Sequence, residues 1–404
     1  MNPVKLAEGV YWVGAVDWDT RFFHGHTFST HHGTTYNAYL ILDEKVTLVD
    51  TVFPPFAEEM IERIKQIIDP QKIDYVIANH VEMDHSGSLP KILSLAPKAK
   101  LICNVRCKEG LLKHYFTDWD FQLVKTGDKL SLGKRTLSFL ETPMLHWPDS
   151  MWTYLIEDEI LLCNDAFGQH YASSERFDDE FEECIIMHAA AKYYANILMP
   201  LGSIAVKKIG ETQKLGWKIK MAAPAHGFIW KNPQKIIDAY FHWEKGEAKD
   251  RVVIAFDSMY GATEKMALAI AEGIKKEKVE VDIYKLPISD KHDVIAEVLE
   301  AKGLLVGSST VNNDYLPDIP AFLVNLRGLK PKNKIGGAFG SFGWSGGAVK
   351  NIETMLQEMK IEIFEPGISV KYVPTEEELN KCFEFGRRFA QRIKGAGSKE
   401  LKEM

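Results

Sequence analysis

The sequence is poor in cysteine and has no long apolar run. Five cysteines among 404 residues are too few, and odd in number, for a disulfide framework. Cys103 and Cys107 form a C-x3-C pair without a second pair, whereas a rubredoxin-type or structural zinc site needs four thiolates. No stretch approaches the roughly 20 apolar residues of a membrane span, and none near the start resembles a signal peptide. We therefore expect no membrane association and a reducing, cytoplasmic location.

The sequence also lacks a block of basic residues. Its net charge of -7 is spread along the chain, which argues against nucleic acid as a partner. No repeats or low-complexity tracts occur. An apolar content of 46% and a charged content of 26% are ordinary for a soluble globular protein, and the length suits two to three domains.

The pattern of the chain changes near residue 250. Before it, extended segments alternate with turns, at residues 36–49, 74–79, 100–105, 136–141 and 152–163, the last containing a hairpin turn at 157–159. A polar stretch over residues 244–250 has linker composition. We expect one domain over residues 1–249 and a second over residues 250–404.

The second domain alternates regularly between strands and helices. Short apolar strands are predicted at residues 252–256, 279–284, 303–306, 334–339 and 368–373, with helical patterns between them and a last helix over 376–393. This alternation predicts a doubly wound, five-stranded parallel sheet.

The strongest chemical signal is a run of ligand-capable residues after the apolar strand that ends at Asn79. His80, Glu82, Asp84 and His85 supply four such side chains within six residues, a density that is hard to explain as a solvated loop. Each of three further candidates follows an apolar stretch: His146, Asp165 and His226. Any of these three alone is as easily a core, turn or surface residue. Ends of several strands are where a rigid scaffold holds such a constellation.

Three polar loops of the second domain indicate a phosphate-bearing planar ligand. The first follows the first strand and precedes a helix, so its hydroxyls and the helix N-terminus would cradle a phosphate monoester. It contains Ser258, Met259, Tyr260, Gly261, Ala262 and Thr263. No Lys-Ser/Thr follows at Walker spacing, which excludes a nucleotide triphosphatase loop.

Two further loops follow the third and fourth strands, where doubly wound sheets bind ligands. Their candidate contacts are Ser309, Thr310, Asn312, Asn313, Ser341, Gly343, Trp344 and Gly346. Glycines allow a flat ring to approach the backbone, and Trp344 is placed to stack on or flank it. Together the three loops resemble those of flavodoxin, whose ligand is FMN.

The run H-x-E-x-D-H resembles the metallo-β-lactamase motif H-x-H-x-D-H, with Glu82 in place of the second histidine. An added carboxylate makes the site richer in oxygen, which suits iron better than zinc. This variant, together with the S-x-x-G-x-T loop, resembles the flavodiiron proteins over essentially the whole chain. The resemblance implies an N-terminal αββα metallo-β-lactamase-like sandwich and a C-terminal flavodoxin-like domain.

The same resemblance implies the metal ligands. One iron would take His80, Glu82 and His146, the other would take Asp84, His85 and His226, and Asp165 would bridge them. His24, Trp147 and Tyr194 match family positions near the metals. Ligand type alone does not fix occupancy, because zinc binds such sites more tightly than ferrous iron.

Flavodiiron proteins reduce dioxygen to water, nitric oxide to nitrous oxide, or both, and the sequence does not choose between these reactions. Two ferrous ions and a reduced FMN together hold four electrons, a number that suits the reduction of dioxygen as well as that of nitric oxide. Two alternatives remain: a dizinc metallo-hydrolase with an accessory flavodoxin domain, and an electron-transfer flavoprotein with a degenerate lactamase domain.

The chain carries no rubredoxin module, so electrons must come from an external donor, by resemblance rubredoxin or a reduced deazaflavin. Domains of these sizes have radii of gyration of roughly 18 and 15 Å. Cofactors on separate domains would then lie ~40 Å apart within one chain, too far for direct electron tunnelling. A head-to-tail homodimer, or a tetramer built from such dimers, would bring each FMN to its partner's metals.

Overall fold

The computed structural model describes residues 2–400. The chain divides into two compact units. The first comprises the chain up to Tyr194 together with Leu201–Phe241, and the second comprises Ala195–Pro200 together with the chain from His242 onward. The second unit therefore includes a six-residue segment from within the first half of the sequence, which composition alone does not indicate.

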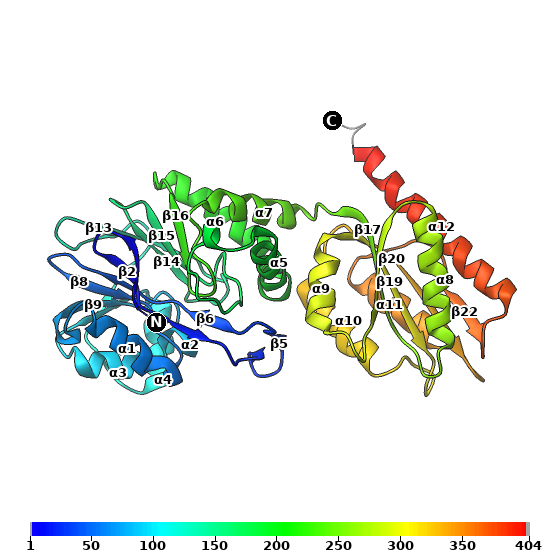
Figure 1. The fold of residues 1–404 in the computed structure, drawn as a ribbon, viewed down its shortest axis with the longest axis horizontal. Helices are drawn as coiled ribbons and strands as arrows, with labels where there is room; N and C mark the ends of the chain where they lie inside the picture. The colour runs from blue at the N-terminus through cyan, green and yellow to red at the C-terminus, as the bar shows by residue number, and fades with distance from the viewer. Residues whose placement is uncertain (1, 401–404) are drawn as a thin grey trace. The chain divides into compact units, whose positions relative to one another are not determined.

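Two mixed sheets form the centre of the first unit (Figure 1). The first sheet has the order β1-β2-β7-β8-β9-β10-β11 and consists of β1 (Val4–Ala7), β2 (Val10–Trp12), β7 (Tyr39–Ile41), β8 (Val46–Val49), β9 (Ile73–Ile77), β10 (Lys100–Cys103) and β11 (Phe121–Leu123). The second has the order β12-β13-β14-β15-β16 and consists of β12 (Lys129–Ser131), β13 (Thr136–Glu141), β14 (Met151–Leu155), β15 (Ile160–Asn164) and β16 (Met221–Pro224). The predicted hairpin turn at residues 157–159 joins the antiparallel strands β14 and β15.

Two small hairpins lie outside these sheets. One pairs β3 (Ala15–Asp17) with β6 (Thr34–Tyr36), and the other pairs β4 (Phe22–Phe23) with β5 (Phe28–Ser29). The segment predicted as extended over residues 36–49 contains the last residue of β6 and the whole of β7 and β8. Asp43 and Glu44 lie in the turn between the antiparallel strands β7 and β8.

Helices cover the outer faces of both sheets, which gives the αββα sandwich predicted from the sequence (Figure 1). The first sheet carries α1 (Ala57–Lys65), α2 (Met83–Ser86), α3 (Leu89–Leu95) and α4 (Val105–Tyr115). The second carries α5 (Glu183–Tyr193), α6 (Gly202–Lys214) and α7 (Pro233–Lys245).

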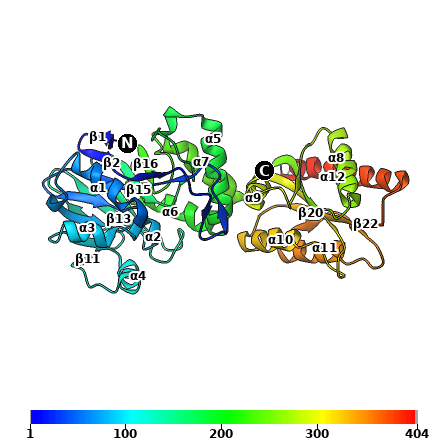
Figure 2. The same ribbon diagram turned by 60° about the horizontal axis from the view of Figure 1, so that its bottom comes forward.

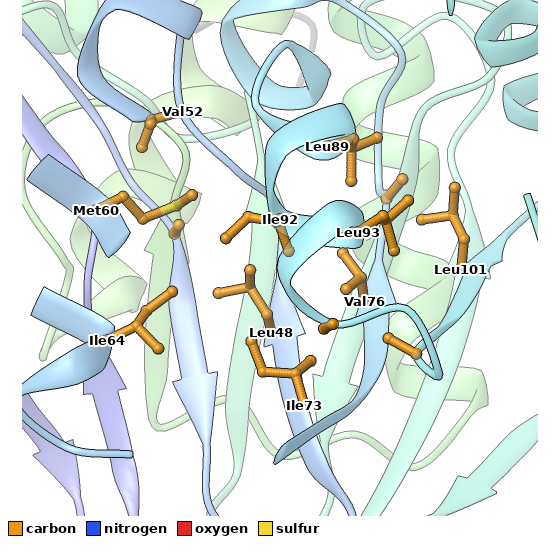
Figure 3. Close-up of a cluster of buried hydrophobic side chains, with 14 of the residues drawn as sticks. Leu48, Val52, Met60, Ile64, Ile73, Val76, Leu89, Ile92, Leu93 and Leu101 are labelled. Atoms are coloured by element: carbon orange, nitrogen blue, oxygen red, sulfur yellow. The ribbon is translucent and has the colours of Figure 1, made fainter. Parts of the chain in front are cut away.

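The central strands of the first sheet are buried on both faces. Leu48, Val76 and Leu101 pack against α1 and α3, as the close-up shows (Figure 3). Their immediate neighbours Val49, Ile77 and Ile102 pack between the two sheets. Because successive side chains of a strand point to opposite faces, continuous apolar runs are required here, and they hold the ends of these strands in fixed positions.

The second unit is a parallel sheet with helices on both faces (Figures 1 and 2). Its strands are β17 (Lys249–Asp257), β18 (Glu280–Lys285), β19 (Ala301–Ser309), β20 (Ile335–Phe342), β21 (Glu362–Ile363) and β22 (Ile368–Lys371). Its helices are α8 (Ala262–Lys276), α9 (Lys291–Glu300), α10 (Asp318–Leu329), α11 (Ala348–Glu358) and α12 (Glu376–Glu400).

The parallel order β18-β17-β19-β20 agrees with the doubly wound sheet predicted from the sequence, and α8 and α12 cover one face. The fifth position beside β20 is shared by β21 and β22, which pair with different parts of that strand. Only β22 was expected, since β21 is too short to give a periodic pattern. Among residues 2–400, no helix combines the length and apolar character that a bilayer span requires.

Candidate functional site

The seven predicted ligands all lie where strands of the first unit end. His80 and Glu82 follow β9, and Asp84 and His85 lie in the short helix α2. His146 is in the loop between β13 and β14, Asp165 directly follows β15, and His226 comes two residues after β16. The structure brings these residues together in two neighbouring groups, although they span almost 150 positions of the sequence.

The first group gathers around the Glu82 carboxylate. Its Oε2 lies 3.3 Å from Nε2 of His80 and 3.2 Å from Nε2 of His146. Burial raises the pKa of Glu82, but hydrogen bonds with His146, His24 and His80 outweigh it and hold the pKa well below its usual range. Two imidazole nitrogens and one carboxylate oxygen therefore converge on one point.

The second group gathers around Asp84. Its Oδ1 lies 3.3 Å from Nε2 of His85, and its Oδ2 lies 3.1 Å from Nε2 of His226. Burial lowers the pKa of His226, yet hydrogen bonds with Asp165 and Asp84 raise it to about 10. A metal ion would have to displace that proton, because histidine binds metals in its neutral form.

Asp165 lies between the two groups and presents one oxygen to each. Its Oδ1 is 3.1 Å from Nε2 of His85 and 3.5 Å from Nε2 of His226. Its Oδ2 is 3.7 Å from Nε2 of His80 and 3.6 Å from Nε2 of His146. This is the arrangement of a carboxylate that bridges two metal ions.

The donor set fits two iron ions. Four imidazoles and three carboxylates give a mixed nitrogen and oxygen environment. Three buried ligand atoms, Oδ1 of Asp84, Oδ2 of Asp165 and Nε2 of His85, have no hydrogen-bond partner among residues 2–400. Buried polar atoms are rarely left unpaired, so these atoms point to a bound ligand.

Hydrogen bonds on the outer side of the ligands fix the orientation of two imidazoles. Nδ1 of His80 lies 3.1 Å from Oδ2 of Asp149, and that oxygen also accepts the Val81 N–H at 2.7 Å. Nδ1 of His226 lies 2.7 Å from the carbonyl oxygen of Thr35. Both contacts leave Nε2 free to face the centre, as outer-shell partners of metal-binding histidines do.

A buried polar network supports the strand ends behind the ligands. Asp50 accepts hydrogen bonds from the backbone N–H of Asn79 at 2.8 Å and from the side-chain amides of Asn79 and Asn164 at 3.0 and 3.2 Å. Thr153 in turn donates to Oδ1 of Asn79 at 2.7 Å. The network joins four strands, β8, β9, β14 and β15, at the edge from which the ligands project.

Two of the three residues expected beside the ligands lie there. Nε2 of His24, on the β4–β5 hairpin, is 3.0 Å from Oε1 of Glu82. The Trp147 ring packs edge-on against His80 with the ring centroids 5.1 Å apart. The third, Tyr194, stays a prediction, and it is its neighbour Tyr193 that donates to Oδ1 of Asp165 at 3.2 Å. The ring of Tyr194 packs against that of Tyr240, with the centroids 5.0 Å apart.

Sequence reasoning missed Asp149, Tyr193 and His170. Asp149 stands three residues after His146, in the same short run, which was the available signal. His170 is buried five residues after Asp165, and its ring lies 4.8 Å from that of His226. Nothing in the sequence distinguishes His170 from an ordinary core histidine.

The first predicted FMN loop forms a hydroxyl cluster at the N-terminus of α8. Oγ1 of Thr263 lies 3.1 Å from Oγ of Ser309 and 2.9 Å from Oγ of Ser341. Oγ of Ser258 accepts the N–H of Gly261 at 3.1 Å, and Gly261 has φ 83°, a conformation that glycine adopts without strain. The cluster draws on all three predicted loops, although only the first was expected to cradle a phosphate.

The rest of these loops forms an open rim. Tyr260 and Trp344 are 93% and 83% exposed, and Met259 is also exposed. Asn312 and Asn313 adopt left-handed backbone conformations, and Thr310 donates its N–H to the carbonyl oxygen of Ser341 at 2.8 Å. Of the other predicted residues, Ala262 and Gly343 are half-buried and Gly346 is exposed. Exposed aromatic side chains beside a hydroxyl cluster suit a phosphate-bearing ring such as FMN.

Comparisons with known proteins agree with this geometry. Residues 34–227 match the family described as ODP family beta lactamase, and residues 254–386 match flavodoxin. The chain is 54% identical to a nitric oxide reductase of Moorella thermoacetica, over 97% of this chain and 99% of that protein.

Two solved structures are similar along almost the whole chain. One is the rubredoxin oxygen:oxidoreductase of Desulfovibrio gigas, with a TM-score of 0.95, 37% identity and coverage of 98% of this chain and 99% of that one. The other is the flavodiiron protein of Giardia intestinalis, with a TM-score of 0.95, 37% identity and coverage of 99% and 98%. The nitric oxide reductase and the rubredoxin oxygen:oxidoreductase are oxidoreductases and support that interpretation over the dizinc hydrolase. The chain belongs to the flavodiiron proteins.

Proposed function

We propose that His80, Glu82 and His146 hold one iron, that Asp84, His85 and His226 hold the other, and that Asp165 bridges them. The observation that carries this proposal is the position of Asp165, whose two oxygens face the two groups of histidines separately. A zinc hydrolase of this fold would also use two metals, but the carboxylate at position 82 and the flavin domain favour redox chemistry.

We infer that FMN binds at the three loops of the second unit. The hydroxyls of Thr263, Ser309 and Ser341 would hold its phosphate at the N-terminus of α8, and Trp344 would flank its ring. When bound, FMN and the iron pair supply the electrons that reduce dioxygen to water or nitric oxide to nitrous oxide.

The chain's own residues supply proton-bearing groups beside the centre. His24 presents Nε2 to Glu82, and a hydrogen bond with that carboxylate raises the pKa of His24. Tyr193 presents its hydroxyl to Asp165. Both reductions consume protons, so a protonated imidazole and a phenol next to the ligands suit them.

We further propose that an external donor, rubredoxin or a reduced deazaflavin, delivers electrons to a head-to-tail homodimer, in which the FMN of one chain serves the irons of the other. The presence of the two sites on separate compact units supports this proposal. Mixing an Asp165→Ala variant with a variant that binds no FMN tests it, because mixed dimers should regain part of the activity. Persistent inactivity after proven subunit exchange would contradict it.

The proposed function is tested by the metal content and reactivity of Asp165→Ala. We expect this variant to lose both irons and all gas reduction while it retains FMN, because its carboxylate faces both groups. Asp118→Ala, on an exposed loop, is the matched control. Wild-type protein that holds two zinc ions and hydrolyses an ester without consuming either gas would overturn the proposal.

A further inference from the structure

The β4–β5 hairpin carries His24 to the centre, yet its own strand pairing is short. Each of its strands has two residues, Phe22–Phe23 and Phe28–Ser29. An isolated two-stranded hairpin is marginally stable in water. The 3.0 Å contact between His24 and Glu82 therefore depends on packing that holds the hairpin against the rest of the unit.

One buried side chain, His170, lies beneath both strands of the hairpin. The ring of Phe23 stacks on His170 with centroids 4.3 Å apart and an interplanar angle of 27°. The ring of Phe28 lies 5.2 Å from the same imidazole. Oγ1 of Thr34 lies 2.8 Å from Nδ1 of His170, which fixes the orientation of the ring.

The imidazole of His170 also contacts residues of the proposed iron centre. Its centroid lies 4.8 Å from that of His226 and 5.0 Å from that of Tyr193, which bonds to Asp165. Its Nε2 is buried and has no hydrogen-bond partner in the described part of the chain. An apolar ring would fill the same space without leaving a buried nitrogen unpaired, so packing alone does not account for a histidine here.

We propose that His170 is a positioning residue that holds the β4–β5 hairpin, and with it His24, against Glu82. This inference rests on the proposed function only in that Glu82 is taken as an iron ligand. By occupying Oε1 of Glu82, His24 leaves Oε2 to face His80 and His146. His170 thus acts on the centre through the hairpin and not by contact with the substrate.

Amide hydrogen exchange of the hairpin tests whether His170 holds it in place. In His170→Ala, amides over residues 22–29 should exchange faster than in wild type, by about tenfold or more, while those of β13 and β14 stay unchanged. Thr34→Val, which removes the hydrogen bond without opening a cavity, should give a smaller change of the same kind. His188→Ala, on the exposed side of α5, is the control. Unchanged exchange in both His170→Ala and Thr34→Val would overturn the proposal.

A double-mutant cycle in the iron-loaded holoenzyme tests whether His170 acts through His24. His170→Ala and His24→Ala should each lower kcat/KM, and the double variant should be no slower than His24→Ala alone. Iron content should be equal in all four proteins. Effects that multiply would show that the two residues act independently and would contradict the proposal. The exchange result does not depend on turnover, so a wild type without gas reduction would refute the proposed function and leave this test standing.

Discussion

Asp149 and His80 are 69 positions apart in the sequence, and their side chains meet at 3.1 Å. The same carboxylate accepts the N–H of Val81, so it fixes both the imidazole and the backbone that carries it. The side-chain amide of Asn104 donates to the carbonyl oxygen of Asp149 at 2.6 Å and holds this residue in turn. The orientation of His80 therefore depends on Asp149 and, through it, on Asn104, which is the N-cap of α4.

The substitution Asp149→Asn should weaken iron binding roughly 10–100-fold, the usual effect of losing an outer partner of a metal-binding histidine. The loss follows because an amide cannot stabilise the His80 ring as the carboxylate does. Competition with a coloured chelator measures the affinity. Asp118→Asn should behave as wild type, and an Asp149→Asn variant that retains wild-type affinity would refute the role of this contact.

The substitution Tyr193→Phe should lower the rate of gas reduction about tenfold, as the loss of one hydrogen bond worth about 1.4 kcal/mol would. Iron and FMN contents should not change, since neither cofactor would lose a ligand. Tyr194→Phe is the matched neighbour and should leave the rate near that of wild type. The reverse result would support the expectation drawn from the sequence, that Tyr194 acts beside the metals.

The metal ligands could be predicted from the sequence because each follows a recognisable apolar strand and four of them stand within six residues. The parallel sheet of the second unit could also be predicted, since its strands alternate with helices and β17 and β19 contain apolar runs. The roles of His170 and Asp149 could not be predicted from the sequence, because they depend on contacts with residues far away along the chain. The hydrogen bond of Tyr193 to Asp165 was likewise not predictable, because two adjacent tyrosines point in different directions and the apolar pattern does not say which one faces the ligands.

The substitution Thr263→Val should weaken FMN binding roughly 10–100-fold, because a hydrogen bond to a charged phosphate contributes about 1.5–3 kcal/mol. The Thr263 hydroxyl lies between those of Ser309 and Ser341, at the centre of the cluster. Fluorescence titration of flavin-free protein with FMN gives the affinity. Thr354→Val, on the exposed face of α11, is the control, and equal affinity in both variants would place the phosphate elsewhere.

Lys334 should make the stability of the flavin domain depend on pH. Burial lowers the pKa of Lys334 from 10.5 to about 7, while Nζ donates to the carbonyl oxygens of Leu299 and Ala301. Between these pKa values the unfolded chain binds more protons than the folded one. The free energy of unfolding should therefore rise from pH 7 towards 10.5, by at most about 1.4 kcal/mol per pH unit, and be lowest below pH 7.

Denaturant unfolding of the wild type and of Lys334→Met between pH 6 and about pH 10 measures this effect. The variant should lack this rise, because methionine does not titrate. Lys276→Met, at an exposed position on α8, should keep the wild-type slope. Equal slopes in wild type and Lys334→Met would show that Lys334 remains charged when buried.

The central claim is that this protein couples bound FMN to a pair of irons for the reduction of a small gas, and a single-turnover experiment tests it most directly. Iron-loaded protein is reduced anaerobically until the flavin absorbance is bleached, and is then mixed with a measured amount of dioxygen or nitric oxide. The account predicts full return of the flavin absorbance, with one dioxygen consumed per chain and no peroxide released, or with nitrous oxide as the product. Flavin that stays bleached, or that returns with stoichiometric hydrogen peroxide, would contradict it.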